Sequence, residues 1–436
     1  MRERDAEKRY PISLQAASLV FPLQALFGAF EDWMSPERYK NFDEWMDQVL
    51  PYHGGPAEQQ DLKKKLRDQR ETWLDSISDY EFPIVELAPT TSAEAVCTIF
   101  ETLNRTGVKL SVFDLLTARF RPQGVNLREY WKAALKKHPI LKEFDVDPYY
   151  ELQTLALLTA SGAASCKRGD LLGMNSQQIA KGWEKAVGGM TAALKLLRDE
   201  CGILVSKWVP YNTIVIPLAG IMAVGASYTG PAQGAVRRDV QRWFWCSIFD
   251  QRYEASPNSQ SAKDFTEVKA WFAHGPEPET VKQFSFVPEV LRETTPRQRG
   301  LYRGVMALVM RYGARDFHNC NKISAEAIQT QQIDDHHVFP RAWLADHAGS
   351  TPVELQECVL NKTLIDKKTN GRIGKRAPSD YLKEIEDEIG IEQLKNVLDS
   401  HLLPSAPDSA LRHDNFEGFL KERQALIEAK VKQVTG

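Results

Sequence analysis

The sequence predicts a mainly α protein with a small α+β part close to its C-terminal end. Apolar residues recur every three or four positions in several long segments, the spacing that places them on one face of a helix. Two short runs, residues 332–338 and 360–365, have the length of strands instead, and a short helix candidate at 367–373 follows them. The 436 residues, of which 43% are hydrophobic, suffice for two or three domains with buried cores.

The first 90 or so residues are expected to be helical and rather polar. Residues 19–30 are an apolar helix candidate, residues 61–73 are charged on most faces, and the run at 82–87 has the composition of a strand. Farther on, Ser111 and Asp114 have the spacing of an N-terminal cap for the helix that follows them.

The middle of the chain carries the clearest helical pattern. Apolar positions follow helical spacing from Ile179 to Leu197, and Gly202 is a natural stop beyond them. The apolar stretch 214–226 is too short to cross a membrane and contains a proline, so we expect a buried helix there. The aromatic run 243–245 is more typical of a core than of a base-stacking surface.

Composition limits the kinds of partner and site. A net charge of −3 argues against a polybasic binder, so any contact with nucleic acid must be local. The six cysteines are scattered without a CxxC pair, which excludes a zinc site built from paired CxxC motifs. The first ten residues are charged and lack the apolar core of a signal peptide, so we expect a cytoplasmic protein with no membrane partner.

The most informative stretch runs from residue 333 to residue 375. His336 and His337 stand side by side at the end of the first strand candidate, and Asn361 opens the second. Asp366 can cap the short helix at 367–373, which would carry Asn370. Alone, a His pair often marks an ordinary strand end, and an Asn before a Gly often marks a turn. Together, the four residues are expected to surround one point.

This layout resembles the ββα-metal (HNH) nuclease finger. The resemblance implies that His336 and Asn370 are metal ligands, that His337 is the general base, and that Asn361 orients this base. We therefore expect helical domains plus a C-terminal HNH finger, acting as a DNA endonuclease that hydrolyses phosphodiester bonds.

The residue types suit that chemistry. An attacking water must be deprotonated near neutral pH, and histidine is the side chain whose ordinary pKa lies there. A site with only two protein ligands suits Mg²⁺, which keeps several waters, and an imidazole ligand would also accept Mn²⁺. The expected metal is thus Mg²⁺ or Mn²⁺.

A cationic run surrounds the motif. Between residues 361 and 376 there is one acid, Asp366, so the segment carries a local charge of about +5 in an acidic chain. The alternative to a role in binding is an ordinary solvated helix face. The predicted contacts to the DNA backbone are Lys362, Lys367, Lys368, Arg372, Lys375 and Arg376.

A second resemblance concerns most of the chain after residue 82. The segment FETLNRTGVKLSVFDLL, residues 100–116, closely resembles the end of the N-terminal domain of GmrSD-type, modification-dependent (type IV) restriction enzymes, an architecture shared with SspE-like proteins. Those proteins join a ParB/sulfiredoxin-like nucleotide-hydrolysing domain to an HNH nuclease. The resemblance implies antiviral defence, with modified phage DNA as substrate.

One departure from that family concerns nucleotide hydrolysis. The family's DGQQR motif is absent, so no nucleotide is expected as a cofactor of this chain, and a separate NTPase subunit or a homodimer are expected partners. The expected domains are a helical remnant of a ParB/sulfiredoxin-like domain at 1–125, a helical middle domain at 126–298 and a nuclease domain at 299–436. Residues 274–300 are rich in Pro, Glu and Thr, so we expect a linker there. The alternative function is a non-catalytic remnant that binds DNA or a partner.

Overall fold

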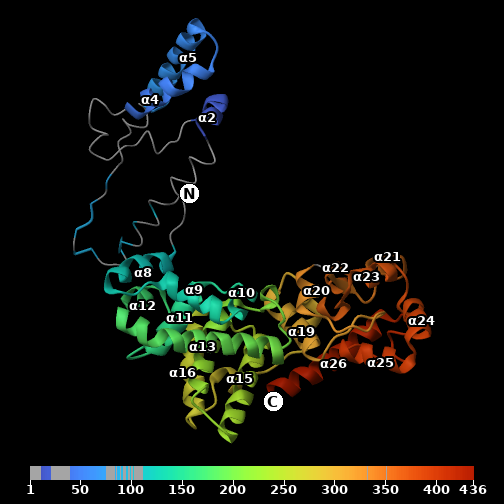
Figure 1. Cartoon of the computed structure of the whole chain (residues 1–436). Coiled ribbons are helices and arrows are strands. Elements are labelled where there is room, and N and C mark those ends of the chain that lie inside the picture. The colour runs from blue at the N-terminus through green and yellow to red at the C-terminus, as the bar shows by residue number, and fades with distance from the viewer. Residues whose placement is uncertain are drawn as a thin grey trace. The chain divides into compact units, whose positions relative to one another are not determined.

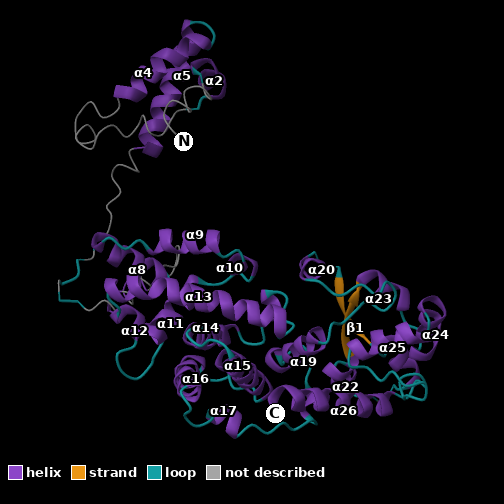
Figure 2. Ribbon diagram, turned by 60° about the horizontal axis from the view of Figure 1, so that its bottom comes forward, coloured by secondary structure: helices purple, strands orange, loops and turns teal. Residues whose placement is uncertain are grey.

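The computed structural model describes residues 11–20, 40–74, 111–330, 332–349 and 351–436, with a few single positions between 84 and 102. The chain divides into two compact units, residues 1–89 and 90–436. Its described part is mainly helical, with one two-stranded antiparallel sheet (Figures 1 and 2). The predicted fold class is confirmed in this coarse form.

The first unit contains short helices around a small apolar core that includes Trp45 and Met46. The helix expected at 61–73 corresponds to the end of α5 and the π-helical turn that follows it. Most of the helix expected at 19–30 lies outside the described residues, as does half of the strand expected at 82–87, and the described positions 84, 86 and 87 are not in a strand. The helices are α2 (Ile12–Ser18), α4 (Lys40–Val49) and α5 (Pro56–Gln69), with turns at Leu50–Tyr52 and Arg70–Leu74.

The first completely described helix of the second unit lies just after residues 100–110. Most of residues 100–110 lies outside the described part, but the predicted cap is confirmed. Ser111 Oγ accepts a hydrogen bond from the backbone N–H of Asp114 (3.2 Å), and the Asp114 carboxylate accepts one from the backbone N–H of Ser111. Because both of these backbone N–H groups have an acceptor, helix α8 (Val112–Phe120) starts at this point.

A helical layer follows, centred on the predicted helix at 179–197. That helix is α13. Beyond its end, Gly202 has a φ of 73°, a backbone conformation that does not continue the helix. The helices are α9 (Leu127–Lys137), α10 (Ile140–Glu143), α11 (Pro148–Thr159), α12 (Arg168–Gly173), α13 (Ser176–Glu200), α14 (Val215–Gly225), α15 (Pro231–Phe249) and α16 (Pro257–Phe272), with 3-10 turns at Arg121–Gln123, Ser206–Trp208 and Asn212–Ile214.

Helices α13 and α14 form the centre of this layer. A Cβ added at Gly189 on α13 would lie 2.3 Å from the carbonyl oxygen of Ala219 on α14, so glycine permits this close approach. Helix α14 is apolar on all sides and almost entirely buried, as the sequence predicted. The aromatic residues at 243–245 are also buried in the core. In the described part of the chain, no helix is both long and apolar enough to cross a membrane.

The segment expected to be a linker packs against the core. It contains the short helices α17 (Glu279–Lys282) and α18 (Val290–Glu293), whose Val281 and Leu291 are buried. The apolar core is continuous from Val112 to Val431. The boundary at residue 298 between the middle domain and the nuclease domain stays a prediction.

The C-terminal region surrounds the sheet (Figure 2). Strand β1 (Ile333–His337) pairs antiparallel with β2 (Lys362–Asp366). The other elements are α19 (Arg299–Arg311), α20 (Ala325–Gln329), α21 (Arg341–His347), α22 (Val353–Gln356), the 3-10 turn Val359–Asn361, α23 (Lys367–Ile373), α24 (Pro378–Ile389), α25 (Ile391–Ser400) and α26 (Phe416–Thr435).

The last helix fixes the start of β2 through a buried arginine. Arg423 on α26 is fully buried and donates hydrogen bonds to the carbonyl oxygens of Leu360 (2.6 Å) and Lys362 (2.8 Å). These two carbonyls flank Asn361. The guanidinium has several donors in a rigid fork, so it can satisfy carbonyls that the two-stranded sheet leaves unpaired.

Candidate functional site

Strand β1, the 3-10 turn before strand β2 and helix α23 carry the four predicted residues, and of these four the structure joins His336 to Asn370. In the register of the sheet, His336 lies opposite Thr363 and His337 opposite Lys362. The Asp366 carboxylate accepts a hydrogen bond from the backbone N–H of Lys368 (2.7 Å), so helix α23 begins where the sequence predicted. Because successive side chains of a strand point to opposite faces, the two imidazoles have different surroundings.

His336 faces helix α23. Its side chain is 2% exposed, and its Nδ1 lies 2.7 Å from Oδ1 of Asn370. The Asn370 amide nitrogen in turn donates to the carboxylate of Asp334 (3.0 Å), which lies two residues earlier on β1. Burial lowers the pKa of His336 to about 3, so the imidazole is neutral at physiological pH. Its Nε2 is buried without a hydrogen-bond partner in the described part of the structure.

His337 faces a carboxylate that the sequence reasoning missed. Its Nε2 lies 2.9 Å from Oε1 of Glu357, in the loop between α22 and β2. Burial and the charge of Lys362 hold the pKa of His337 below its usual 6.5, although Glu357 opposes this shift. The imidazole is therefore largely neutral near pH 7. When Nε2 donates its proton to the carboxylate, Nδ1 remains as the proton acceptor of the ring.

Glu357 is shared among three cationic or basic groups. Besides His337, its carboxylate lies 3.1 Å from Nζ of Lys362 and 3.2 Å from Nε of Arg341. Burial alone would raise the pKa of Glu357, but His337 and Lys362 hold it below the usual value. No sequence signal singled out Glu357, because it lies 20 residues after His337 in a loop without a motif.

Asn361 is fully buried and binds backbone rather than an imidazole. Its Oδ1 accepts from the backbone N–H of Phe339 (2.8 Å), and its Nδ2 donates to the carbonyls of Phe339 (3.1 Å) and Gln356 (2.9 Å). The amide thus ties the turn after His337 to the loop that carries Glu357. Among the described residues, no hydrogen bond joins the Asn361 amide to His337, so the expected contact between this amide and the base is not formed.

A second set of hydrogen bonds supports the strands and helix α23 from behind. The buried Asp316 carboxylate accepts from the backbone N–H of Asp366 and from the hydroxyl of Thr369, both at 2.8 Å. His401 accepts from the Thr363 hydroxyl (2.6 Å) and donates to the carbonyl of Arg315 (2.5 Å). These contacts satisfy the Asp316 carboxylate and both ring nitrogens of His401, so the two strands and the start of helix α23 are held in place.

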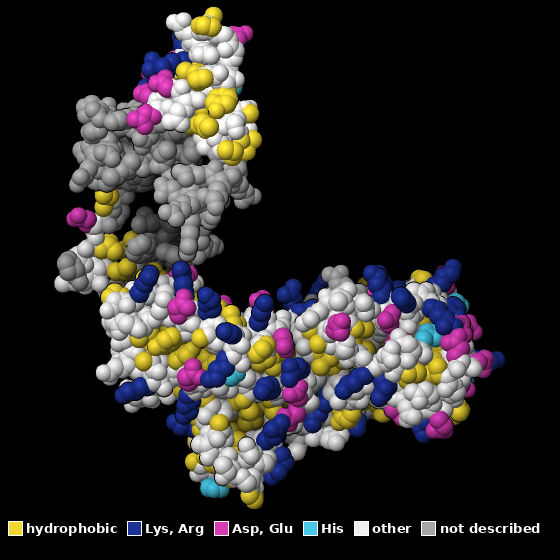
Figure 3. Space-filling view, in the orientation of Figure 1, with side chains coloured by type: hydrophobic (Ala, Val, Ile, Leu, Met, Phe, Trp, Pro, Cys, Tyr) yellow, Lys and Arg dark blue, Asp and Glu magenta, His cyan; other side chains and the backbone are white. Residues whose placement is uncertain are grey.

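The six predicted DNA contacts divide into two groups. Lys362 is 4% exposed and paired with Glu357, while Arg372 and Arg376 pair with Glu384 of α24. Lys367, Lys368 and Lys375 are exposed, and none of them has an ion-pair partner among the described residues. Across the visible face of the larger unit, Lys and Arg side chains are spread widely (Figure 3). Cations that are already paired are less available to phosphate than the three free lysines.

Two side chains could share a metal ion. Within the described ranges, no group of three or more His, Cys, Asp or Glu side chains is arranged to hold one. His336 Nδ1 and Asn370 Oδ1 face each other at 2.7 Å, and neighbouring ligands around an octahedral Mg²⁺ with bonds of about 2.1 Å lie roughly 3 Å apart. The spacing of this pair therefore matches two adjacent ligand positions.

Comparison with known proteins adds a relative of unknown activity. No family model matches the chain. An uncharacterized protein of Methanocaldococcus jannaschii is 31% identical over 401 residues, an alignment that covers 82% of this chain. The chain spans 65% of the length of that relative.

Proposed function

We propose that this chain is a metal-dependent DNA endonuclease whose active centre is a ββα-metal finger of the HNH type, formed by β1, β2 and α23. The observation that carries the proposal is the placement of two imidazoles at one strand end. His336 pairs with Asn370 of α23 (2.7 Å), and His337 pairs with Glu357 (2.9 Å). These neutral imidazoles supply the two functions that phosphodiester hydrolysis requires, a ligand and a base.

His336 and Asn370 would hold the Mg²⁺ or Mn²⁺ ion. The spacing of both side chains fits this role, because His336 Nδ1 and Asn370 Oδ1 lie 2.7 Å apart. The ring proton would then reside on Nε2, which is buried without a partner in the described structure. The ion would stabilise negative charge on the phosphate and on the leaving oxygen. The Asp334 carboxylate, bonded to the Asn370 amide, orients that side chain.

His337 would accept the proton of the attacking water at Nδ1. Glu357 holds Nε2 and thereby fixes the ring orientation and the tautomer, as a carboxylate commonly does for a catalytic histidine. Asn361 keeps the following turn in place through its three backbone hydrogen bonds. Lys367, Lys368 and Lys375 are the side chains available to hold the DNA backbone.

The biological role that we propose is defence against foreign DNA, as a modification-dependent restriction enzyme acting on modified phage DNA in the cytoplasm. It rests on the resemblance of residues 100–116 and of the finger to GmrSD-type enzymes. A separate NTPase subunit would supply nucleotide hydrolysis. A second copy of the chain, or a second visit, would be needed to cut both strands, because one finger handles one phosphodiester.

A plasmid nicking assay tests the proposal. Supercoiled DNA that is unmodified, glucosylated or phosphorothioated is incubated with the protein and Mg²⁺ or Mn²⁺, with EDTA as the negative condition. We expect His337→Asn to abolish nicking, whereas His274→Asn, at an exposed position with a φ of 63°, leaves it unchanged. Folded protein that nicks none of these substrates would favour the alternative of a binding remnant, and nicking by His337→Asn at the normal rate would remove this residue as the base.

A further inference from the structure

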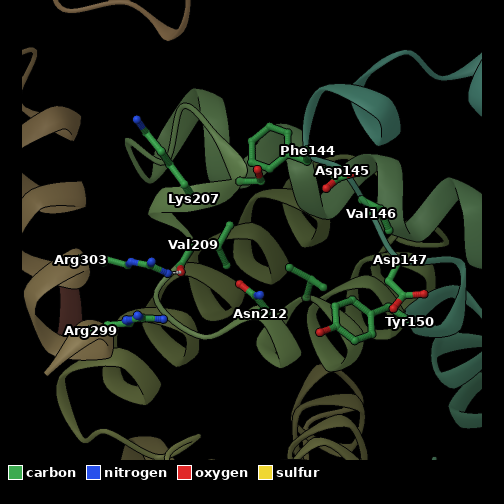
Figure 4. A pocket seen from close by; sticks show the side chains of 12 residues that line it. Phe144, Asp145, Val146, Asp147, Tyr150, Lys207, Val209, Asn212, Arg299 and Arg303 are labelled. Atoms are coloured by element: carbon green, nitrogen blue, oxygen red, sulfur yellow. Dashed lines mark hydrogen bonds between the residues drawn. The ribbon is translucent and has the colours of Figure 1, made fainter. Parts of the chain in front are cut away.

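A polar pocket of about 450 Å³ lies outside the finger (Figure 4). Its walls come from the α10–α11 connection, the 206–212 loop, α14 and α19. This size is in the range of pockets that enclose small ligands. Nothing in the nuclease chemistry uses these residues.

One wall of the pocket is cationic. Arg299 and Arg303 lie one turn apart on α19, so both side chains project from the same face of the helix toward the pocket (Figure 4). Neither arginine has an ion-pair partner among the described residues. Burial and the nearby charge of Arg299 lower the pKa of Arg303. Two unpaired guanidinium groups at this spacing form a site for an anion, which would relieve their repulsion.

The Arg303 side chain is held in place before any ligand arrives. Its Nη1 donates a hydrogen bond to the carbonyl oxygen of Val209 at 2.9 Å. This contact leaves the other donors of the guanidinium for the pocket. A fixed guanidinium loses little side-chain entropy when it binds a phosphate, so this arrangement increases the affinity of the pocket for a phosphate group.

The opposite wall accepts hydrogen bonds. Asp145 and Asp147 follow α10, and the ring of Tyr150 lies beside Asp147, with the Asn212 amide between this wall and the arginines (Figure 4). Asp147 also accepts a hydrogen bond from the backbone N–H of Tyr149 (2.8 Å), which caps α11, while Asp145 has no ion pair in the described part. Carboxylates bind hydroxyl and amine donors, and an aromatic ring can stack on a base.

We propose that this pocket binds a nucleotide unit, with its phosphate on Arg299 and Arg303 and its base or sugar donors toward Asp145, Asp147 and Tyr150. A ligand with a phosphate at one end and hydrogen-bond donors at the other matches both walls. The nucleotide can be free or part of a strand. Helix α19 also carries Tyr302, whose hydroxyl donates to the Asp335 carboxylate of β1 (2.6 Å), so the pocket and the finger share one helix.

The test is a binding measurement in EDTA, where cleavage does not occur, so its result is independent of the proposed nuclease activity. Calorimetric titrations of the full chain use the four deoxynucleoside 5′-monophosphates, the matching nucleosides, inorganic phosphate and a single-stranded 12-mer. We expect Arg299→Gln to raise the Kd of the bound nucleotide or strand at least about tenfold, the loss of one charge-assisted contact. The nucleosides, which lack the phosphate, should bind the unaltered chain at least about tenfold more weakly than the matching nucleotides.

Matched variants decide among the outcomes. Arg238→Gln changes an exposed arginine on α15 outside the pocket and should bind as the unaltered chain does. Arg303→Gln also removes the bond to Val209, so the exposed Arg299 is the primary test, and Asp145→Asn probes the other wall. Binding of mononucleotides identifies a free ligand, and binding of the 12-mer alone identifies a nucleotide within a strand. No binding of any phosphate compound, or equal affinity for Arg299→Gln and Arg238→Gln, overturns the proposal.

Discussion

Replacing Glu357 by glutamine tests the arrangement around the proposed base. The substitution keeps the size of the side chain but removes the charge that lies 2.9 Å from His337 Nε2 and 3.1 Å from Lys362 Nζ. A hydrogen bond to a charged group contributes about 1.5–3 kcal/mol. If this energy orients the imidazole in the transition state, the rate of DNA cleavage should fall by roughly 10- to 100-fold.

The same substitution has a predicted effect on stability. Lys362 is 4% exposed and would lose its carboxylate partner, so we expect Glu357→Gln to lower the free energy of unfolding by about 1–3 kcal/mol. Glu354→Gln is the matched control, because Glu354 is an exposed carboxylate on α22, three residues earlier. Glu354→Gln should change neither the rate of DNA cleavage nor the free energy of unfolding.

The assay is single-turnover nicking of supercoiled plasmid over a range of Mg²⁺ concentrations, beside urea unfolding of the same variants. We expect the maximal rate to fall while the Mg²⁺ concentration at half-maximal rate stays constant, since Glu357 contacts the base and not the pair His336 and Asn370. A maximal rate equal to that of Glu354→Gln would refute the positioning role of Glu357. A shifted metal dependence with an unchanged maximal rate would place Glu357 in metal binding instead.

Four further predictions follow from the described contacts. Asn370→Ala removes one of the two proposed metal ligands, so it should lower the nicking rate at least about tenfold, and excess Mg²⁺ or Mn²⁺ should partly restore this rate. A loss of nicking rate that does not depend on metal concentration would contradict a ligand role for Asn370. Replacing Lys367 and Lys368 together by glutamine should weaken the salt dependence of DNA binding: the slope of log affinity against log salt concentration should fall in magnitude by roughly 1–2. Anisotropy titrations measure this slope, and an unchanged slope would show that neither lysine contacts phosphate. Burial lowers the pKa of His401 to about 4, so the unfolded state binds the proton first as pH falls, and this group alone should lower stability by about 3 kcal/mol between pH 6.5 and pH 4. Because His336 and Glu151 titrate over the same range, the contribution is measured by urea unfolding as the difference in pH dependence between the unaltered chain and His401→Gln, and identical pH dependences would contradict it. Burial raises the pKa of Glu151 to about 8, so the native state retains a proton that the unfolded state releases, and this group alone should lower stability by about 3 kcal/mol between pH 4.5 and pH 7. The contribution is measured as the difference in pH dependence between the unaltered chain and Glu151→Gln, and identical pH dependences would show that Glu151 does not make it.

The parts of the fold that depend on local spacing could be predicted from the sequence. The helical period at 179–197 predicts α13, the Ser111 and Asp114 pair starts α8, and Asp366 starts the short helix that carries Asn370. Strand and helix lengths then place His336 against Asn370, because both positions are set by elements only a few residues long. Local hydrogen bonds and side-chain periodicity are visible in one stretch of sequence.

Which polar groups meet, and which of them are buried, depends on contacts between segments that are distant in the sequence. Glu357 reaches His337 across 20 residues, and Lys362 lies against it instead of facing solvent as the basic run had suggested. Asn361 binds the backbone of Phe339 because the turn after β1 passes directly over it. The pocket between Arg299 and Asp145 likewise joins segments more than 150 residues apart. Burial and pairing at such separations depend on how helices pack, a property that composition and periodicity do not encode.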